Sequence, residues 1–224
     1  MKSILGFIAV LALSQSAVSV STAYARTSED NRTPGSVGLG LGLGTFLFPV
    51  SGTSLALDYN LTPSLQLEFR GASGDFNGDD LVDSNYDTVY VHKLNLDAQL
   101  YEARAKLFLG NSFYFAGGLG QRHLGIDVEA SDFQTQVQGD FTADSTCFQF
   151  GLGNIWTLDS GLFLGAEWLA FSIPLSSTSS SSYNVRGASD ADTEKLKRDT
   201  QDVADRLGKV TSVGLLTFHI GYQF

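Results

Sequence analysis

The chain has 224 residues, and its 24 acidic against 14 basic side chains give a formal net charge of −10. This acidic excess disfavours nucleic acid as a partner, because phosphate backbones are bound by basic surfaces. Cys147 stands alone, which excludes an intrachain disulfide, and we expect it to be a small packing residue. The length suits one domain, and no apolar run reaches the roughly 20 residues of a membrane-spanning helix.

The first 25 residues have the pattern of a cleavable signal peptide. Lys2 supplies a positive charge, residues 4–13 form an apolar stretch, and residues 23–25 read Ala-Tyr-Ala, a small-x-small cleavage site. A membrane anchor is the alternative, but the apolar stretch is too short to span a bilayer. We expect residues 1–25 to be removed on export and the polar residues 26–35 to form a flexible lead-in.

From Gly35 onward, apolar residues recur at every second position. In residues 38–44, Gly-Leu-Gly-Leu-Gly-Leu-Gly, each leucine falls on one strand face and each glycine on the other, which a helix would scramble. The alternation returns in about eight segments, a strand count that small barrels have. The predicted strands are 36–48, 53–61, 64–74, 89–110, 113–128, 142–158, 162–174 and 209–224. The sequence predicts an all-β fold, an eight-stranded antiparallel transmembrane β-barrel over residues 36–224.

The connections between these segments alternate between short and long. The tight turns are 61–64, 110–112 and 159–161, and the long polar connections are 75–88, 129–141 and 175–208. Short turns on one rim and long surface loops on the other are typical of outer-membrane barrels. Within the last loop we expect a short helix over Asp190–Leu207, capped by Ser189 or Asp190 and ended by Gly208.

The final strand sets the two faces of the predicted barrel. Leu216 and every second residue to Phe224 share the apolar face, which must meet lipid, while His219 shares the other. The same parity turns nearly all mid-strand charges inward, as expected because a charge facing lipid costs about 2–4 kcal/mol. The predicted outward residues are Leu65, Leu67, Phe69, Tyr101, Ala103, Ala105, Leu107, Leu162, Leu164, Ala166 and Trp168.

The predicted lumen is charged and crowded. Its charge network comprises Asp58, Glu68, Arg70, Glu102, Arg104, Lys106, Arg122, Glu167 and His219. Inward glycines leave room for these side chains: Gly38, Gly40, Gly42, Gly44, Gly118, Gly120, Gly151, Gly153 and Gly165. An eight-stranded barrel is only wide enough for its own side chains. We expect acids and bases to pair and to plug the lumen.

The parity slips near Leu100 and again over residues 122–124. Each slip predicts either a β-bulge or the point at which the strand leaves the membrane. The second interpretation is favoured, because both places lie toward the surface side of their strands.

The C-terminal residues carry a resemblance to a known family. Phe224, preceded at every second position by Tyr222, Ile220 and Phe218, resembles the signal by which the barrel-assembly machinery recognises its substrates. With the signal peptide and strand count, the chain resembles the small OmpA-, OmpX- and OmpW-like barrels. The resemblance implies the outer membrane of a Gram-negative cell, with residues 26–35 in the periplasm. It also implies contact with outer-membrane lipid and lipopolysaccharide.

The sequence shows no catalytic constellation, and we expect neither an enzyme nor a cofactor. Neither His123 nor His219 is followed by the serine that lipid A deacylases of the PagL type use, and no glycine motif for nucleotides is present. The segment from Asp75 resembles a calcium loop, but glycine and glutamate are missing from its sixth and twelfth places. A solvated acidic loop is favoured over a metal site. The weak metal candidates are Asp75, Asn77, Asp79 and Asp83.

Three functions fit these patterns. The leading hypothesis is a rigid scaffold that displays surface loops to an extracellular partner. A narrow gated channel or a conduit for small hydrophobic molecules, of the OmpW kind, is the alternative, with Arg104→Ala predicted to raise conductance. A soluble, ligand-binding barrel is disfavoured by the outward aromatic residues and the C-terminal signal.

Overall fold

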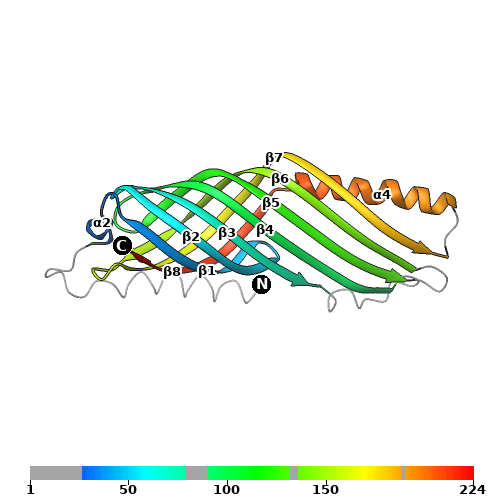
Figure 1. The fold of residues 1–224 in the computed structure, drawn as a ribbon, viewed down its shortest axis with the longest axis horizontal. Helices are drawn as coiled ribbons and strands as arrows, with labels where there is room; N and C mark the ends of the chain where they lie inside the picture. The colour runs from blue at the N-terminus through cyan, green and yellow to red at the C-terminus, as the bar shows by residue number, and fades with distance from the viewer. Residues whose placement is uncertain (1–26, 79–89, 132–135, 188–189) are drawn as a thin grey trace, which may run out of the picture.

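The computed structural model describes residues 27–78, 90–131, 136–187 and 190–224, and within these ranges eight antiparallel strands form one closed barrel (Figure 1). The strands are β1 (Val37–Leu47), β2 (Val50–Thr62), β3 (Leu65–Asn77), β4 (Tyr90–Phe108), β5 (Phe113–Ser131), β6 (Gln136–Thr157), β7 (Leu162–Arg186) and β8 (Ser212–Gln223). Each strand pairs with the next in the chain, and β8 pairs with β1. The predicted fold class is confirmed. The predicted signal peptide, residues 1–25, lies outside the described residues and stays a prediction.

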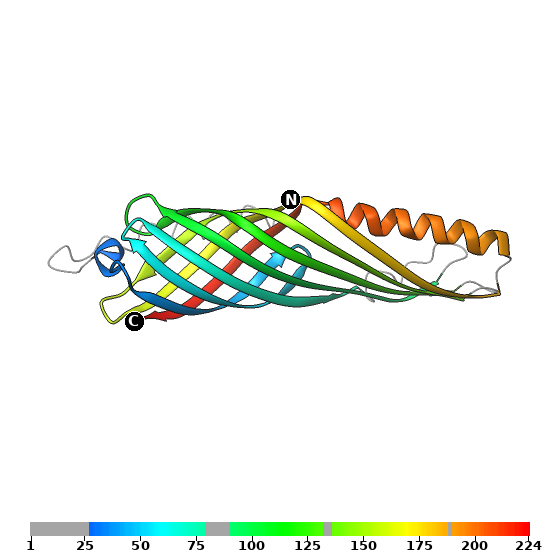
Figure 2. The same ribbon diagram turned by 45° about the horizontal axis from the view of Figure 1, so that its top comes forward.

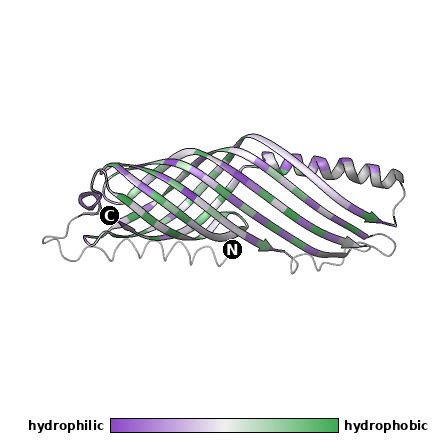
Figure 3. Ribbon diagram, in the orientation of Figure 1, coloured by the Kyte–Doolittle hydropathy of each residue, from purple (hydrophilic) through white to green (hydrophobic). Residues whose placement is uncertain are grey.

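The alternation of residue types explains why these segments close into a barrel. On β1 the leucines face outward, with Leu41 61% exposed, while Gly40 and Gly42 are buried in the lumen. Bands of opposite hydropathy follow one another along the strands (Figure 3). A closed ring satisfies all of its backbone groups between strands, and this permits an apolar outer surface in hydrocarbon. No helix within the described ranges is long and apolar enough to cross a membrane.

Strands β4 to β7 continue far beyond the rim of the barrel (Figures 1 and 2). The pairing of β3 with β4 ends at Asn77 and Asn95, and that of β7 with β8 ends at Ser172 and Ser212. Beyond these points β4, β5, β6 and β7 still pair with one another, as far as Arg186 opposite Gln136. We call residues 90–94, 123–131, 136–145 and 173–186 the protruding sheet.

The protruding sheet corrects the predicted surface loops. Residues 129–131 and 136–141 of the predicted second loop are paired strand, and so are residues 176–186 of the third. β3 also runs three residues past its predicted end, to Asn77. The loop predictions were wrong because they recognised a strand only by the apolar residues that face lipid at every second position. Outside the membrane, strand pairing continues with polar side chains on the outward face.

The outward face changes from apolar to polar where the strands leave the membrane, and this change explains the two parity slips. The pairing of β4 with β5 is regular from Lys93 to Phe108, so neither Leu100 nor residues 122–124 form a bulge. Leu100 and Ala98 are buried on the inward face, while Asp97 and Gln99 are exposed on the outward face. The strands therefore keep their parity, and their polarity inverts where they leave the apolar belt.

Helix α4 (Asp190–Lys209) packs on the inward face of β6 and β7 in the protruding sheet. Ala204 is fully buried, and Ser181 Oγ donates a hydrogen bond to Gln201 Oε1 at 3.1 Å. Ser179 donates to Asp205, and this bond together with one from Gln201 lowers the pKa of the Asp205 carboxyl. The predicted helix is confirmed, and it extends two residues beyond its predicted end.

Strand β8 holds one irregularity that the parity prediction missed. Its register with β1 shifts at Leu216, where φ is +50°, and Leu216 has no partner in the ladder with β7. Leu215 is 43% exposed on the outward face, and Leu216, which was predicted to face lipid, is only partly exposed at this irregularity. Ala166, which was predicted to face outward, pairs with the outward Phe218 but is only 9% exposed.

Candidate functional site

The lumen contains a network of buried ion pairs from four strands. Arg104 on β4 reaches Glu68 of β3 at 2.5 Å and Glu167 of β7 at 2.8 Å through Nη2, and its Nε lies 3.3 Å from Glu102. Arg70 contacts Glu102 and lies 3.1 Å from Glu167. These five side chains are almost completely buried. Arg104 is the centre of the network, because it touches three carboxylates.

Lys106 extends the network toward the periplasmic end. Its Nζ lies 2.5 Å from Glu68 Oε2 and 3.3 Å from Asp58 Oδ1. Tyr114 donates a hydrogen bond to Glu167 Oε2 at 3.2 Å. Among the described residues the network thus holds four carboxylates and three cations. Each of these seven charges has an opposite charge in contact, which buried ions require.

Two residues of the predicted network stand apart from it. Arg122 contacts no carboxylate in the described ranges, and instead donates to Gly208 O at 3.0 Å and Val210 O at 2.9 Å. It places its positive charge at the C-terminal end of α4, where a cation is favourable. His219 lies beside Gly42, and its Nε2 has no hydrogen-bond partner in the described part of the chain. The prediction that Arg122 belongs to the ion-pair network was wrong.

The inward glycines give the network its space. A Cβ at Gly151 would lie 3.0 Å from Glu167 Oε2 and 3.1 Å from Arg104 Nη1. A Cβ at Gly120 would lie 3.2 Å from the Cβ of Glu102. Side chains at these positions would therefore displace the charges, which explains why the lumen around Arg104 is lined with glycine.

Apolar layers, which the sequence analysis missed, lie above and below the charges. The surface-side layer contains Phe46, Leu47, Val50, Ala72, Ala98 and Leu100. The periplasmic-side layer contains Phe108, Tyr114, Ala116, Ile155 and Phe163. Cys147 is a free, fully buried thiol. The tight β1–β2 turn places both Phe46 and Leu47 inside the barrel. Strict alternation allows only one of two consecutive residues to face inward, so the sequence pattern gave no signal for this pair.

The lead-in closes the periplasmic end, contrary to the prediction that it is flexible. Helix α2 (Ser28–Asn31) begins after the capping residue Thr27, and Asn31 Nδ2 donates to Thr157 O at 2.9 Å. Arg32 is 1% exposed, stacks 3.8 Å from the centre of the Phe108 ring, and donates to Pro63 O at 2.6 Å. Burial lowers the pKa of Arg32 to about 10, so its guanidinium is still charged at neutral pH.

The weak metal candidates do not form a loop in the described residues. Asp75 and Asn77 lie on the paired strand β3, opposite Asp97 and Asn95 of β4. Asp79 and Asp83 lie outside the described residues. No cluster of three metal-ligating side chains occurs in the ranges that the structure describes.

The C-terminal aromatic residues face outward, as their parity predicts. Phe218 is 57% and Phe224 76% exposed, and Ile220 and Tyr222 share their face. The Phe224 backbone N–H donates to Val37 O at 2.8 Å, which closes the ring at the periplasmic end. Their role as an assembly signal remains a prediction.

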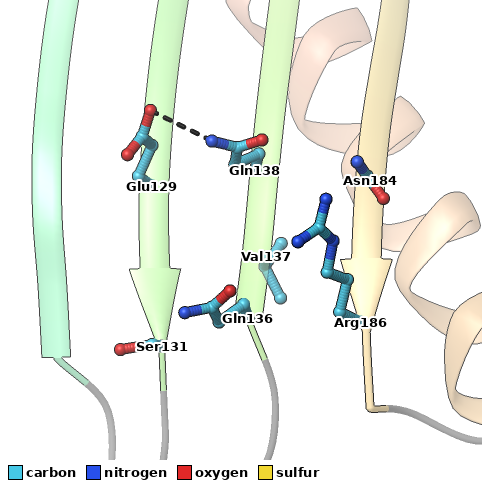
Figure 4. A pocket seen from close by; sticks show the side chains of 7 residues that line it. All are labelled: Glu129, Ser131, Gln136, Val137, Gln138, Asn184 and Arg186. Carbon is cyan, nitrogen blue, oxygen red and sulfur yellow. Dashed lines mark hydrogen bonds between the residues drawn. The ribbon is translucent and has the colours of Figure 1, made fainter.

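A polar cleft lies at the far end of the protruding sheet (Figure 4). It has a volume of about 220 Å³ and is lined by Glu129, Ser131, Gln136, Val137, Gln138, Asn184 and Arg186. Gln138 Nε2 donates to Glu129 Oε1 at 3.3 Å. The cleft brings together a carboxylate, a guanidinium and three amides. Sequence reasoning missed it, because residues 129–141 were assigned to a loop.

A closed antiparallel ring with an apolar exterior and a charged interior defines a transmembrane β-barrel of the outer-membrane class. The protein is an eight-stranded β-barrel that resides in the cell outer membrane.

No protein-family model matches the chain, and no curated protein matches its sequence. Among solved structures it is similar to Ail, the attachment invasion locus protein of Yersinia pestis, with 13% identity, a TM-score of 0.45, and coverage of 86% of this chain and 100% of Ail. It is also similar to CarO2 of Acinetobacter baumannii, with 14% identity, a TM-score of 0.46, and coverage of 84% of this chain and 99% of CarO2. A major outer membrane protein from Thermus thermophilus has 13% identity, a TM-score of 0.45, and coverage of 84% of this chain and 98% of its own. At these identities the similarity concerns the fold alone.

Proposed function

We propose that the protein is a sealed barrel that anchors the protruding sheet at the cell surface, where the sheet binds an extracellular partner. The continuation of β4 to β7 beyond the barrel rim carries this proposal. The sheet is braced by α4, through Ser179, Ser181 and Arg122, so it is a supported platform. Proteins usually carry their binding residues on surface segments that a rigid scaffold holds in position.

The polar cleft is the proposed contact point on this platform. Arg186 and Glu129 offer opposite charges, and the amides of Gln136, Gln138 and Asn184 can each donate and accept hydrogen bonds. This chemistry suits a polar ligand such as a glycan. The proposal includes no catalytic step.

The test uses the purified full-length barrel in nanodiscs on an array of surface glycans and matrix proteins. The double variant Glu129→Ala/Arg186→Ala should lose the signals that the wild type gives. The matched control Ser73→Ala/Gln99→Ala changes outward polar residues near the barrel rim, and should keep them. An array without specific signals, or equal signals from both variants, would contradict the proposal.

The packed lumen predicts a barrel that does not conduct ions steadily. In planar bilayers, the wild type should show no sustained current, because ion pairs, two apolar layers and Arg32 all fill the lumen. Arg104→Ala should give only brief openings, a smaller effect than the sequence alone suggests. Sustained wild-type current would favour the channel alternative, and Lys93→Ala controls for changes in surface charge.

We propose the barrel-assembly machinery as the partner during biogenesis. Removing Phe224 should sharply reduce the amount of folded protein in the outer membrane, because it deletes the terminal aromatic residue and its backbone bonds to Val37. Heat-modifiable mobility on gels of membrane fractions measures the folded amount. Leu109→Ala removes a comparably outward residue from a turn and should have little effect. Equal losses would count against a recognition role for Phe224.

A further inference from the structure

The outer wall of the barrel has a hollow of about 700 Å³ that extends from Leu39 on β1 to Thr146 on β6. Gly71 and Ala103, two small outward residues, form its floor. The larger outward side chains of Leu57, Phe69 and Leu119 surround them. A Cβ at Gly71 would meet only the Tyr101 ring, at 3.5 Å, so the space beside Gly71 is open. We call this hollow the wall groove.

The wall groove runs from an apolar end to a polar end. One register row crosses it, and its outward residues are, in order from β1 to β7, Leu41, Leu55, Gly71, Tyr101, Gln121, Thr146 and Ser176. Gln121 Nε2 donates to Thr146 Oγ1 at 2.9 Å at the polar end. The next row toward the surface contains His123 and Asp144, paired at 2.8 Å. The groove therefore begins inside the apolar belt and ends at the level of the surface-side water boundary.

We infer that the wall groove holds one acyl chain of lipid A, with the acylated sugar at Gln121 and Thr146. The groove is continuous with the lipid-facing belt, so the occupant of its apolar part must come from the bilayer. Its polar end faces the outer leaflet, which in an outer membrane is built of lipid A. A carboxamide beside a hydroxyl can hydrogen-bond the amide, ester and hydroxyl groups that lipid A carries near its sugars.

A specific contact is expected because Gly71 and Ala103 recess the groove between the larger side chains around them. An acyl chain that lies on Gly71 and Ala103 contacts the side walls as well as the floor, and each additional close contact adds dispersion energy. Elsewhere on the belt, leucines project from the wall, as Leu43 does with 65% of its side chain exposed. This inference is independent of the proposed binding by the protruding sheet.

The test fills the groove and leaves the barrel intact. Gly71→Leu places a side chain in the open space, and Gly117→Leu is the matched control, because Gly117 is another glycine without a backbone neighbour, its nearest atom being Phe148 Cζ at 4.0 Å. Full-length protein is reconstituted in phosphatidylcholine vesicles with a minor fraction of lipid A, extracted into detergent and analysed by native mass spectrometry. Heat-modifiable mobility verifies that each variant is folded.

The wild type should retain one lipid A molecule, and retention by Gly71→Leu should fall about tenfold, which corresponds to the loss of about 1.4 kcal/mol. Gly117→Leu should match the wild type. A second variant, Gln121→Ala/Thr146→Ala, should weaken retention with the apolar groove unchanged. Equal retention by all folded variants, or retention of phosphatidylcholine in place of lipid A, would overturn the inference.

Discussion

Arg104→Ala should lower the free energy of unfolding by roughly 3–5 kcal/mol, the range for breaking a buried ion pair by removing one partner. The Arg104 side chain contacts Glu68, Glu102 and Glu167, and the change leaves these carboxylates buried together. Urea titrations of the protein in lipid vesicles, followed by heat-modifiable mobility, measure the change. Lys93→Ala is the matched control, because its 4.0 Å pair with Asp127 is solvent-exposed and such pairs contribute about 0–1 kcal/mol.

A second variant separates the charge of Arg104 from its volume. Arg104→Ala combined with Glu68→Gln removes one negative charge together with the positive one. If unpaired charge dominates, the double variant should be more stable than Arg104→Ala alone, although it changes more of the network. If the cavity dominates, the second change should bring no recovery. A loss from Arg104→Ala no larger than that from Lys93→Ala would mean that water or neighbouring cations compensate the carboxylates.

The network was predictable because period-two alternation carries two kinds of information at once. A charge cannot face hydrocarbon, so parity alone placed Glu68, Arg104 and Glu167 in the lumen, where the structure brings them together. The register between neighbouring strands then determines which of these charges lie side by side. Glu68 lies directly opposite Arg104, and Arg70 opposite Glu102, in the β3–β4 ladder. Pairing across the lumen, as between Arg70 and Glu167, depends on barrel closure and could not be derived from one strand.

The missed features share a physical cause. Alternation marks the outward face as apolar only where lipid surrounds the strand, and this condition ends where the strands enter water. There the apolar residues of β4 turn inward, and the serines of β7 form a strand that composition alone assigns to a loop. Helix α2 was missed for a different reason. Its stability comes from docking on Thr157 and Phe108, distant contacts that a short polar segment does not reveal.

Replacing Gly118 by valine should prevent stable closure of the barrel, while the same change at its neighbour Gly117 should be tolerated. A Cβ at Gly118 would lie 2.7 Å from the Cα of Arg104 and closer still to the Ala103 carbonyl oxygen. Both atoms belong to the β4 backbone, so relief requires β4 and β5 to separate. A Cβ at Gly117 meets nothing nearer than Phe148 Cζ, at 4.0 Å.

Overpacking usually costs about 1–3 kcal/mol and more where the backbone must move, so Gly118→Val should lie at or above the upper end of this range. Gly117→Val should be neutral or stabilising, because valine favours strands and its side chain points away from the lumen. The folded fraction after refolding into vesicles, measured by gel mobility, distinguishes the two. Equal behaviour would contradict the face assignment of β5. Since these neighbours differ in little but the face they occupy, the comparison tests whether lumen space, and not strand propensity, requires the glycines.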